Sequence, residues 1–107
     1  MLGIVRQGDL GTPHGSHPAT ACTNATDSHV YVNGIRVVLE TDIWDRHCGA
    51  GGNCHTYKLI PGSGSSQVNV FIAGKEFVRT GDPMVYYLGN PPCSSVADKC
   101  SIDVFCG

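Results

Sequence analysis

Short runs of alternating hydrophobic and polar residues recur along the chain, and glycine, proline or asparagine interrupts each run. Residues 29–38 form two such runs around an Asn-Gly pair at 33–34, which is the strongest short signal for a β-hairpin. Residues 68–78 repeat the arrangement around an Ala-Gly pair at 73–74. No stretch carries apolar residues at the spacing of an amphipathic helix. The pattern therefore predicts an all-β protein of short strands and hairpins.

A strand that ends at an aspartate occurs three times, in residues 4–9, 34–42 and 74–82. Strand, turn and aspartate recur in the same order, so we interpret the three copies as an internal repeat. We expect their aspartates to accept backbone N–H bonds in turns rather than to act as catalytic carboxylates. These residues are Asp9, Asp42 and Asp82.

The two chain ends supply the halves of a third hairpin. Residues 101–107 resemble the first arm of the other two hairpins, and residues 4–9 resemble a second arm. Three units, one of them split between the ends, close naturally into a ring, so we expect pseudo-threefold symmetry with adjacent termini. Between the arms, the sequence predicts one short strand at 56–60 and loops at 8–27, 43–55, 61–66 and 82–93.

Length, charge and composition exclude several classes of function for this chain. A length of 107 residues predicts a single domain, residues 1–107. The net charge of −2 and the scattered basic residues argue against a nucleic-acid partner. No apolar run is long enough to span a membrane, and the first ten residues lack the apolar core of a signal peptide. No nucleophile or phosphate-binding motif is present, so we expect no enzymatic activity.

Six cysteines and five histidines are the main candidate chemistry. Because synthesis without a signal peptide implies a reducing compartment, we favour a metal site over a disulfide framework. Cysteines outside that site are expected to be small buried hydrophobic residues, with a second metal or a late disulfide as alternatives. These cysteines are Cys22, Cys48, Cys54, Cys100 and Cys106.

Spacing from the repeated aspartates selects candidate ligands. His14 and His47 each lie five residues after their aspartate, so a threefold axis would place them at equivalent positions. The third equivalent residue is Tyr87, which is no zinc ligand, but Cys93 lies six residues further on. His55 lies in the enlarged second loop. Three histidines and one cysteine would complete a closed tetrahedral Zn²⁺ site of the structural type.

Other residues compete for some of these places. His17 lies three residues after the first candidate ligand and could substitute for one of the set. His29 begins a strand and is expected to face solvent. The cysteines near His55 could replace it, and those near the C-terminus compete with Cys93. The competing cysteines are Cys48, Cys54, Cys100 and Cys106.

Loops this rich in glycine and proline cannot pack enough apolar side chains to hold together, and a bound metal could cross-link them instead. Structural zinc contributes on the order of 10 kcal/mol to small domains.

Taken in order, the motifs resemble those of the PAAR-repeat proteins. Residues 78–82, Val-Arg-Thr-Gly-Asp, are similar to the family's Ala-Arg-x-Gly-Asp motif, and Glu-Phe-Val-Arg at 76–79 stands in place of the literal Pro-Ala-Ala-Arg tetrad. The resemblance covers essentially the whole chain. The other segments that carry it are Gly8-Asp9, Thr12-Pro13-His14-Gly15, Asn33-Gly34, His47, His55, Gly62-Ser63 and Cys93-Ser94.

The resemblance implies a small cone of short strands with a metal-stapled apex. It implies a cap on the trimeric β-helical spike of a contractile injection machine, with one tip per trimer and transient contact with the target cell's outer membrane. Such a protein is made in the bacterial cytoplasm and sits at the tip of a phage virion's tail baseplate or of a type VI secretion spike. The short, extension-free chain favours the phage tail. The implied metal is Zn²⁺, with iron as an alternative, held by His14, His47, His55 and Cys93.

A second function stays open on the residues alone. The chain could be a small zinc-binding adaptor with no spike partner.

Overall fold

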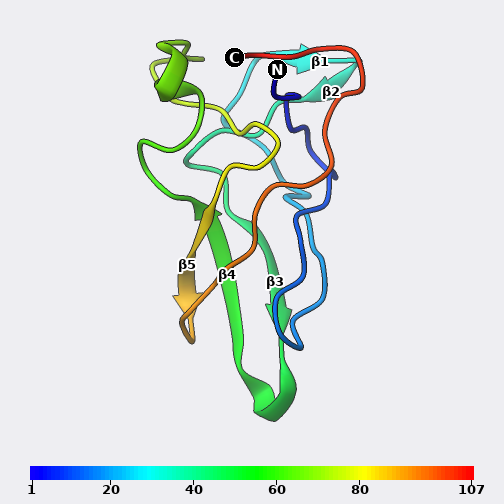
Figure 1. The fold of residues 1–107 in the computed structure, drawn as a ribbon, viewed down its shortest axis with the longest axis vertical. Helices are drawn as coiled ribbons and strands as arrows, with labels where there is room; N and C mark the ends of the chain where they lie inside the picture. Colours follow the sequence, from blue (N-terminus) through cyan, green and yellow to red (C-terminus); the bar gives the residue numbers. More distant parts are fainter.

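The computed structural model describes residues 1–107, which form an elongated molecule with extents of 39 × 24 × 23 Å (Figure 1). The predicted all-β class is confirmed, because the regular elements are short strands with two single-turn 3-10 helices. No helix combines the length and apolar character that crossing a bilayer requires. The elements are β1 (Tyr31–Val32), β2 (Ile35–Arg36), β3 (Trp44–Cys48), η1 (Ala50–Gly52), β4 (Cys54–Leu59), η2 (Ser65–Val68) and β5 (Met84–Gly89).

Three extended segments surround the centre of the molecule and pair in a closed cycle. The N–H of Val5 donates to the carbonyl of Val78 at 3.0 Å. Val78 donates to Val38 at 3.0 Å, and Val38 donates to Val5 at 3.2 Å. Each valine therefore donates to one neighbour and accepts from the other, as a threefold axis requires, and all three side chains are fully buried. The predicted pseudo-threefold arrangement is confirmed.

The turn at the end of each of these segments is also built in the same way. In each of the three repeat units, which we call sectors, the aspartate carboxylate accepts the N–H of the residue three positions earlier. This confirms the role predicted for the aspartates. The pairs are Arg6 to Asp9 at 2.8 Å, Leu39 to Asp42 at 2.8 Å and Arg79 to Asp82 at 2.7 Å.

Two hairpin turns lie at one end of the molecule. The β1–β2 hairpin turns at Asn33 and Gly34, whose φ angles are +54° and +75°. The second hairpin turns at Ala73 and Gly74, with φ angles of +53° and +76°. Positive φ at both central residues is the requirement of the two-residue turn that matches the twist of the strands. Both predicted hairpin turns are therefore confirmed.

The third hairpin is divided between the chain ends, as the repeat predicts. Gly3 pairs with Phe105 in an antiparallel bridge, and the N–H of Ile4 donates to the carbonyl of Val104 at 3.1 Å. The two termini consequently lie at the same end of the molecule, beside β1 and β2 (Figure 1). We call this end the base, and the opposite end, formed by the turn between β3 and β4, the tip.

The predicted first arm at residues 68–71 is wrong. Here η2 ends at Val68, and Asn69 adopts a left-handed conformation with φ of +58°. The N–H of Phe77, which a paired first arm would engage, donates instead to Ser65 Oγ at 2.7 Å. A side chain from the preceding loop thus replaces a strand.

The predicted loops at 43–55 and 82–93 are also partly wrong, because they contain β3 and β5. These strands flank β4 in a three-stranded antiparallel sheet of order β3-β4-β5, which extends toward the tip (Figure 1). The pattern of β5 gives no sign of a strand, because its consecutive residues 86–88 are all exposed on the edge of the sheet. Pairing with β4 stabilises β5, and local alternation contributes little.

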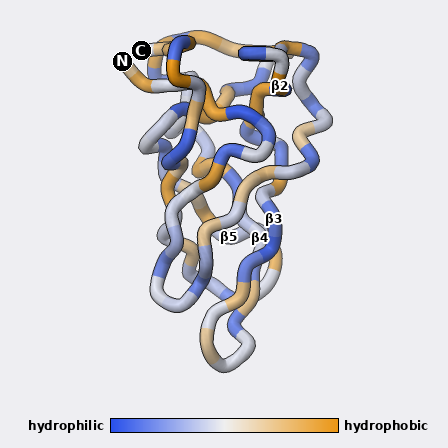
Figure 2. The backbone as a smooth tube through the Cα atoms, turned by 90° about the vertical axis from the view of Figure 1, so that its right-hand side faces the viewer, coloured by the Kyte–Doolittle hydropathy of each residue, from blue (hydrophilic) through white to orange (hydrophobic).

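The hydrophobic core lies in the central part of the molecule and toward the base. Trp44 and Tyr57 join the three central valines in the larger cluster, and a smaller cluster underlies the hairpins. Figure 2 shows strongly hydrophobic stretches at the end that bears the termini and paler colours at the tip. The tip therefore has little apolar material of its own to hold it together. The smaller cluster comprises Ile4, Val32, Val37, Leu39 and Phe77.

Candidate metal centre

The structure brings together all four predicted ligands. One ligand atom from each of His14, His47, His55 and Cys93 lies within 4.8 Å of all the others. His47 comes from β3 and His55 from β4, where they face each other across the ladder. These two side chains are only 2% and 1% exposed, and Cys93 is partly buried. The cluster therefore joins the first loop, the tip hairpin and the segment after β5.

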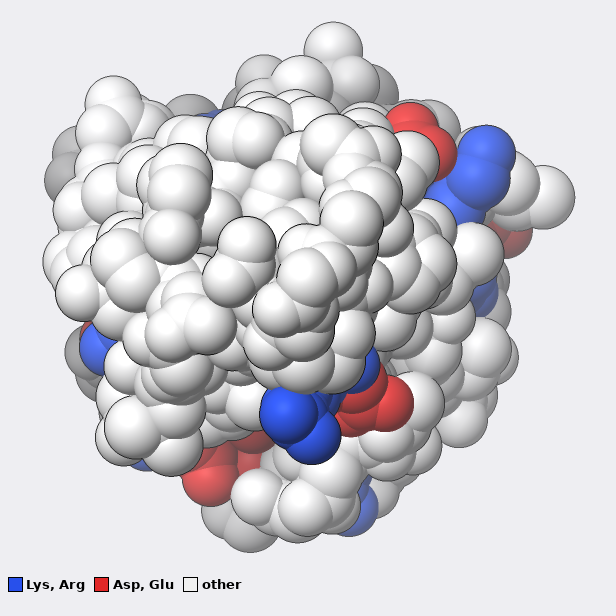
Figure 3. Space-filling view, turned by 90° about the horizontal axis from the view of Figure 1, so that it is seen from below, with Lys and Arg blue, Asp and Glu red and all other residues white.

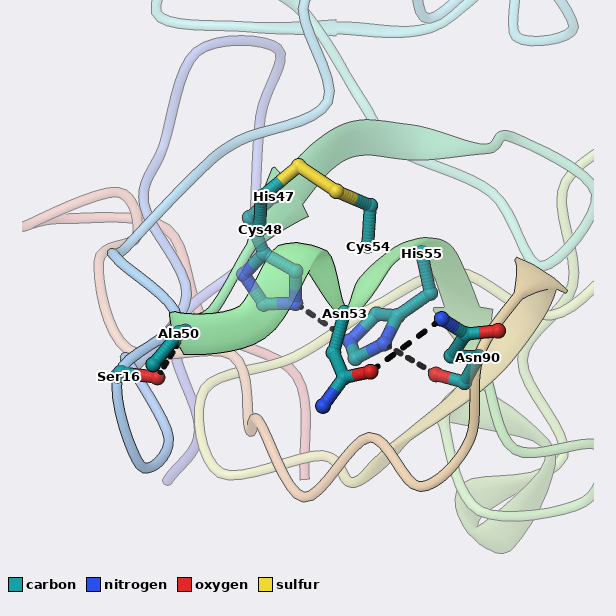
Figure 4. The surroundings of a disulfide bond; sticks show 8 residues. All are labelled: Ser16, His47, Cys48, Ala50, Asn53, Cys54, His55 and Asn90. Carbon is teal, nitrogen blue, oxygen red and sulfur yellow. Dashed lines mark hydrogen bonds between the residues drawn. A yellow bond between two sulfur atoms is a disulfide. The ribbon is translucent and has the colours of Figure 1, made fainter.

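The Nε2 atoms of the three histidines point toward a common centre. They are separated by 3.2 Å between His14 and His47, 3.1 Å between His14 and His55, and 2.7 Å between His47 and His55. The other ring nitrogen is occupied in two of them. Nδ1 of His47 lies 2.9 Å from the carbonyl oxygen of Pro18. Nδ1 of His55 lies 2.7 Å from the carbonyl oxygen of Asn90, a contact that Figure 4 shows.

These contacts fix where the protons and lone pairs lie. A carbonyl oxygen only accepts, so Nδ1 of His47 and of His55 must carry the hydrogen, which leaves a lone pair on each Nε2 of the neutral rings. Two lone pairs that face each other at 2.7 Å repel unless a cation lies between them. A carbonyl on the outer nitrogen is also the usual support of a metal-binding histidine. The arrangement can therefore hold a metal ion.

The donor set fits zinc in kind and in spacing. Zinc-nitrogen bonds of about 2.0–2.1 Å in a tetrahedron place the nitrogens about 3.3 Å apart. The observed separations of 2.7 to 3.2 Å are slightly shorter. A thiolate from Cys93 would provide the fourth ligand, and four protein ligands leave no open position for water or substrate.

Burial keeps His14 and His47 in the neutral form that binds metal. Desolvation lowers the pKa of His14 to about 4, helped by the neighbouring imidazoles of His17, His47 and His55. Burial also lowers the pKa of His47, against the opposing effect of its hydrogen bond to Pro18. Near neutral pH, both rings thus offer a lone pair.

His17 does not belong to the ligand group, although its spacing made it a candidate. Its ring stacks on His14 at a centroid distance of 4.3 Å and on His55 at 4.7 Å. Its Nε2 is buried without a hydrogen-bond partner. Gly49 packs against the ring so closely that a Cβ there would lie 2.7 Å from His17 Cε1. His17 therefore covers the cluster with a ring face, a role that spacing alone did not suggest.

The position five residues after the aspartate holds a predicted ligand in two sectors but not in the third. Tyr87, five residues after Asp82, is 45% exposed on β5, and the ammonium group of Lys58 lies 5.2 Å from the centre of its ring. Cys93, six residues further along, lies in the cluster instead. His29 is exposed, which also agrees with the prediction.

For two cysteines the expected role as buried hydrophobic residues is wrong, and the alternative of a disulfide is confirmed. Cys48 and Cys54 form a disulfide between β3 and β4 (Figure 4), and Cys48 is exposed. The argument from compartment gave no information about distance, whereas these residues lie directly opposite each other in the ladder. Cys22 is buried as predicted, and burial raises the pKa of its thiol to about 12. The remaining free cysteines are only partly buried: Cys93, Cys100 and Cys106.

Comparison with known proteins adds no assignment. No family model matches the chain, and no curated protein matches it either.

Proposed function

We propose that this protein is a structural spike tip that caps a threefold-symmetric, β-helical spike trimer of a contractile injection machine, in a phage tail or a type VI secretion system. One tip would sit on each trimer and sharpen it for passage through a target cell's outer membrane. The observation that carries the proposal is a set of three exposed aromatic residues, one in each sector.

The three aromatic residues hold equivalent positions in the repeat. Tyr31, Phe71 and Phe105 each follow a valine and precede the last residue before a hairpin turn or chain end. Their side chains are 53%, 52% and 42% exposed. β1 and the C-terminal segment both lie at the base (Figure 1). Each unit of the sequence repeat therefore carries one exposed aromatic residue at the same position.

An aromatic residue that occurs once in each of three units fits a partner protein with threefold symmetry. Aromatic side chains are frequent anchors of protein interfaces, because they bury a large area at a small cost in conformational freedom. Three copies around one axis match a partner whose own surface repeats three times, such as the blunt end of a trimer. Short strand edges at the base would continue the strands of such a partner.

The metal centre supports a mechanical role rather than a catalytic one. The tip is poor in apolar residues, and the ligands come from the first loop, from the strands β3 and β4, and from the segment after β5. A bound metal would cross-link these loops, and the closed ligand set offers no place for a substrate. We assign Zn²⁺ to the site from the three nitrogens and one sulfur, with iron as the alternative.

Charge on the tip is consistent with this role. Figure 3, which views the molecule from the tip end, shows a mostly uncharged face with acidic and basic side chains scattered toward the rim. The face carries no basic patch that would attract nucleic acid.

Mixing the chain with a trimeric β-helical spike protein encoded near its gene tests the proposal. Native mass spectrometry should show one chain per trimer. Serine at positions 31, 71 and 105 together should abolish the complex, whereas serine at the exposed Tyr86 and Tyr87 of β5 should not. No complex with the unaltered chain would reject the spike-tip function and favour a zinc-binding adaptor.

A further inference from the structure

The Cys48–Cys54 disulfide lies directly beside two of the metal ligands. Along the β3–β4 ladder, the pair His47–His55 is followed by the pair Cys48–Cys54. Alternation along the strands turns the two histidines inward, where they are 2% and 1% exposed, and turns Cys48 outward to solvent. Figure 4 shows the sulfur bridge joining the strands next to both imidazoles.

Few other contacts hold the strands together at this point. The β3–β4 ladder is irregular between Trp44 and His47, and the β4–β5 ladder is irregular between His55 and Tyr57, so regular pairing is interrupted on the inner side of both histidines. On the outer side, the pair of cysteines is the last pair before the turn.

The turn itself is weakly held. Residues 49–53 include three glycines, and Gly51 and Gly52 adopt left-handed φ angles of +77° and +79°. One backbone bond closes the turn, from the N–H of Gly49 to the carbonyl of Asn53 at 2.7 Å, and Ala50 donates to Ser16 Oγ at 2.7 Å. Glycine-rich backbone loses much conformational freedom when it is ordered. Beyond the ladder pair itself, the sulfur bridge is the one covalent link that holds the two histidine-bearing strands together at the turn.

We propose that Cys48 and Cys54 are an oxidisable thiol pair whose disulfide locks the metal into the tip. In the dithiol state, the two ligand strands separate more readily and the metal dissociates faster. In the disulfide state, the strands are covalently joined one residue away from both ligands, and the metal is retained. The inference rests on the proposed metal centre and adds its regulation by oxidation.

The oxidation needs a partner, and its chemistry balances. A thiolate of the pair attacks the disulfide of a thiol–disulfide oxidoreductase and forms a mixed disulfide, and the second thiolate then displaces the partner's sulfur. The Cys48–Cys54 bond forms, and two electrons and two protons pass to the partner, which leaves as a dithiol. In a reducing compartment the chain would stay in the dithiol state, and transfer to an oxidising one would lock the tip.

Zinc release measures the effect directly. The full chain, loaded with zinc, is prepared in the disulfide state and after treatment with a phosphine reductant, and the transfer of zinc to a chromophoric chelator is followed in time. We expect reduction to accelerate release about 10-fold, in the range found when the support of a metal ligand is removed. The C48S/C54S double variant should release zinc at the fast rate and should not respond to the reductant.

A matched control and two outcomes make the test decisive. The C100S variant removes a free cysteine outside the ligand set and should behave as the unaltered chain does. Equal release from the oxidised and reduced chains would overturn the inference, as would a double variant that still responds to reductant. A chain that binds no zinc in either state would instead overturn the metal centre itself.

Discussion

Replacing Asp82 and Asp9 by alanine compares two copies of the same turn that differ in burial. In both, the aspartate accepts the N–H of an arginine three residues earlier and forms an ion pair with its guanidinium group. The side chains of Asp82 and Arg79 are 5% and 6% exposed, against 14% and 16% for Asp9 and Arg6. We expect Asp82→Ala to destabilise the fold much more than Asp9→Ala.

The magnitude follows from what each change leaves behind. Without Asp82, the buried N–H of Arg79 loses its acceptor at 2.7 Å, which costs about 1–3 kcal/mol. The buried guanidinium also loses the carboxylate 3.6 Å away, and breaking a buried pair costs about 3–5 kcal/mol in total. Arg79 keeps a bond to the carbonyl of Gly64 at 2.9 Å, which limits the loss. We therefore expect about 3–5 kcal/mol.

At Asp9, water can replace much of what is lost. The same N–H bond, at 2.8 Å, lies where solvent has access, so we expect a cost of about 1–2 kcal/mol. The difference of about 2 kcal/mol corresponds to roughly 8–16 °C in melting temperature for a domain of this size.

Urea unfolding of both variants, at saturating zinc and with equal m-values, measures the two free energies of unfolding. Asp42→Ala provides a third point, because this buried carboxylate accepts the N–H of Leu39 at 2.8 Å without a nearby arginine. An equal cost at Asp82 and Asp9, or a larger cost at Asp9, would refute the reasoning from burial.

Two further predictions concern the histidines. Burial lowers the pKa of His14 from 6.5 to about 4, so the unfolded chain binds more protons than the folded chain between these pH values. The free energy of unfolding at constant zinc should therefore fall as the pH drops from about 6.5 toward 4. A melting temperature that stays constant over this pH range would contradict the prediction. Because His17 covers the cluster with its ring face and its Nε2 has no partner, His17→Phe should keep zinc, whereas His17→Ala should release it faster to a chelator. Equal loss in both variants would instead show that the nitrogen of His17 is required.

The threefold ring could be predicted from the sequence because its signals are local. Asn33-Gly34 and Ala73-Gly74 mark two turns through their own backbone preferences, and an aspartate follows each arm at a regular distance. The ligands His14 and His47 followed from the same spacing. His55 and Cys93 were chosen only by the loops in which they lie, because the five-residue spacing does not reach them, and neighbouring cysteines competed with both.

The tip could not be predicted because its structure depends on contacts between distant segments. The pattern in β5 does not alternate, and β4 alone keeps this strand extended. Cys48 and Cys54 become neighbours only because β3 and β4 pair in one register. The stacking of His17 on His55 likewise joins segments that no local pattern connects. In each case the missing information is a contact between segments that are distant in the sequence.

The metal content of the purified chain tests the central claim most directly. Native mass spectrometry combined with elemental analysis should find one metal ion per chain, with zinc as the metal. The His47→Ala and His55→Ala variants should lose it, and His29→Ala, which alters an exposed histidine outside the cluster, should retain it. A folded chain without metal, or variants at positions 47 and 55 that keep a full equivalent, would contradict a metal centre at the tip.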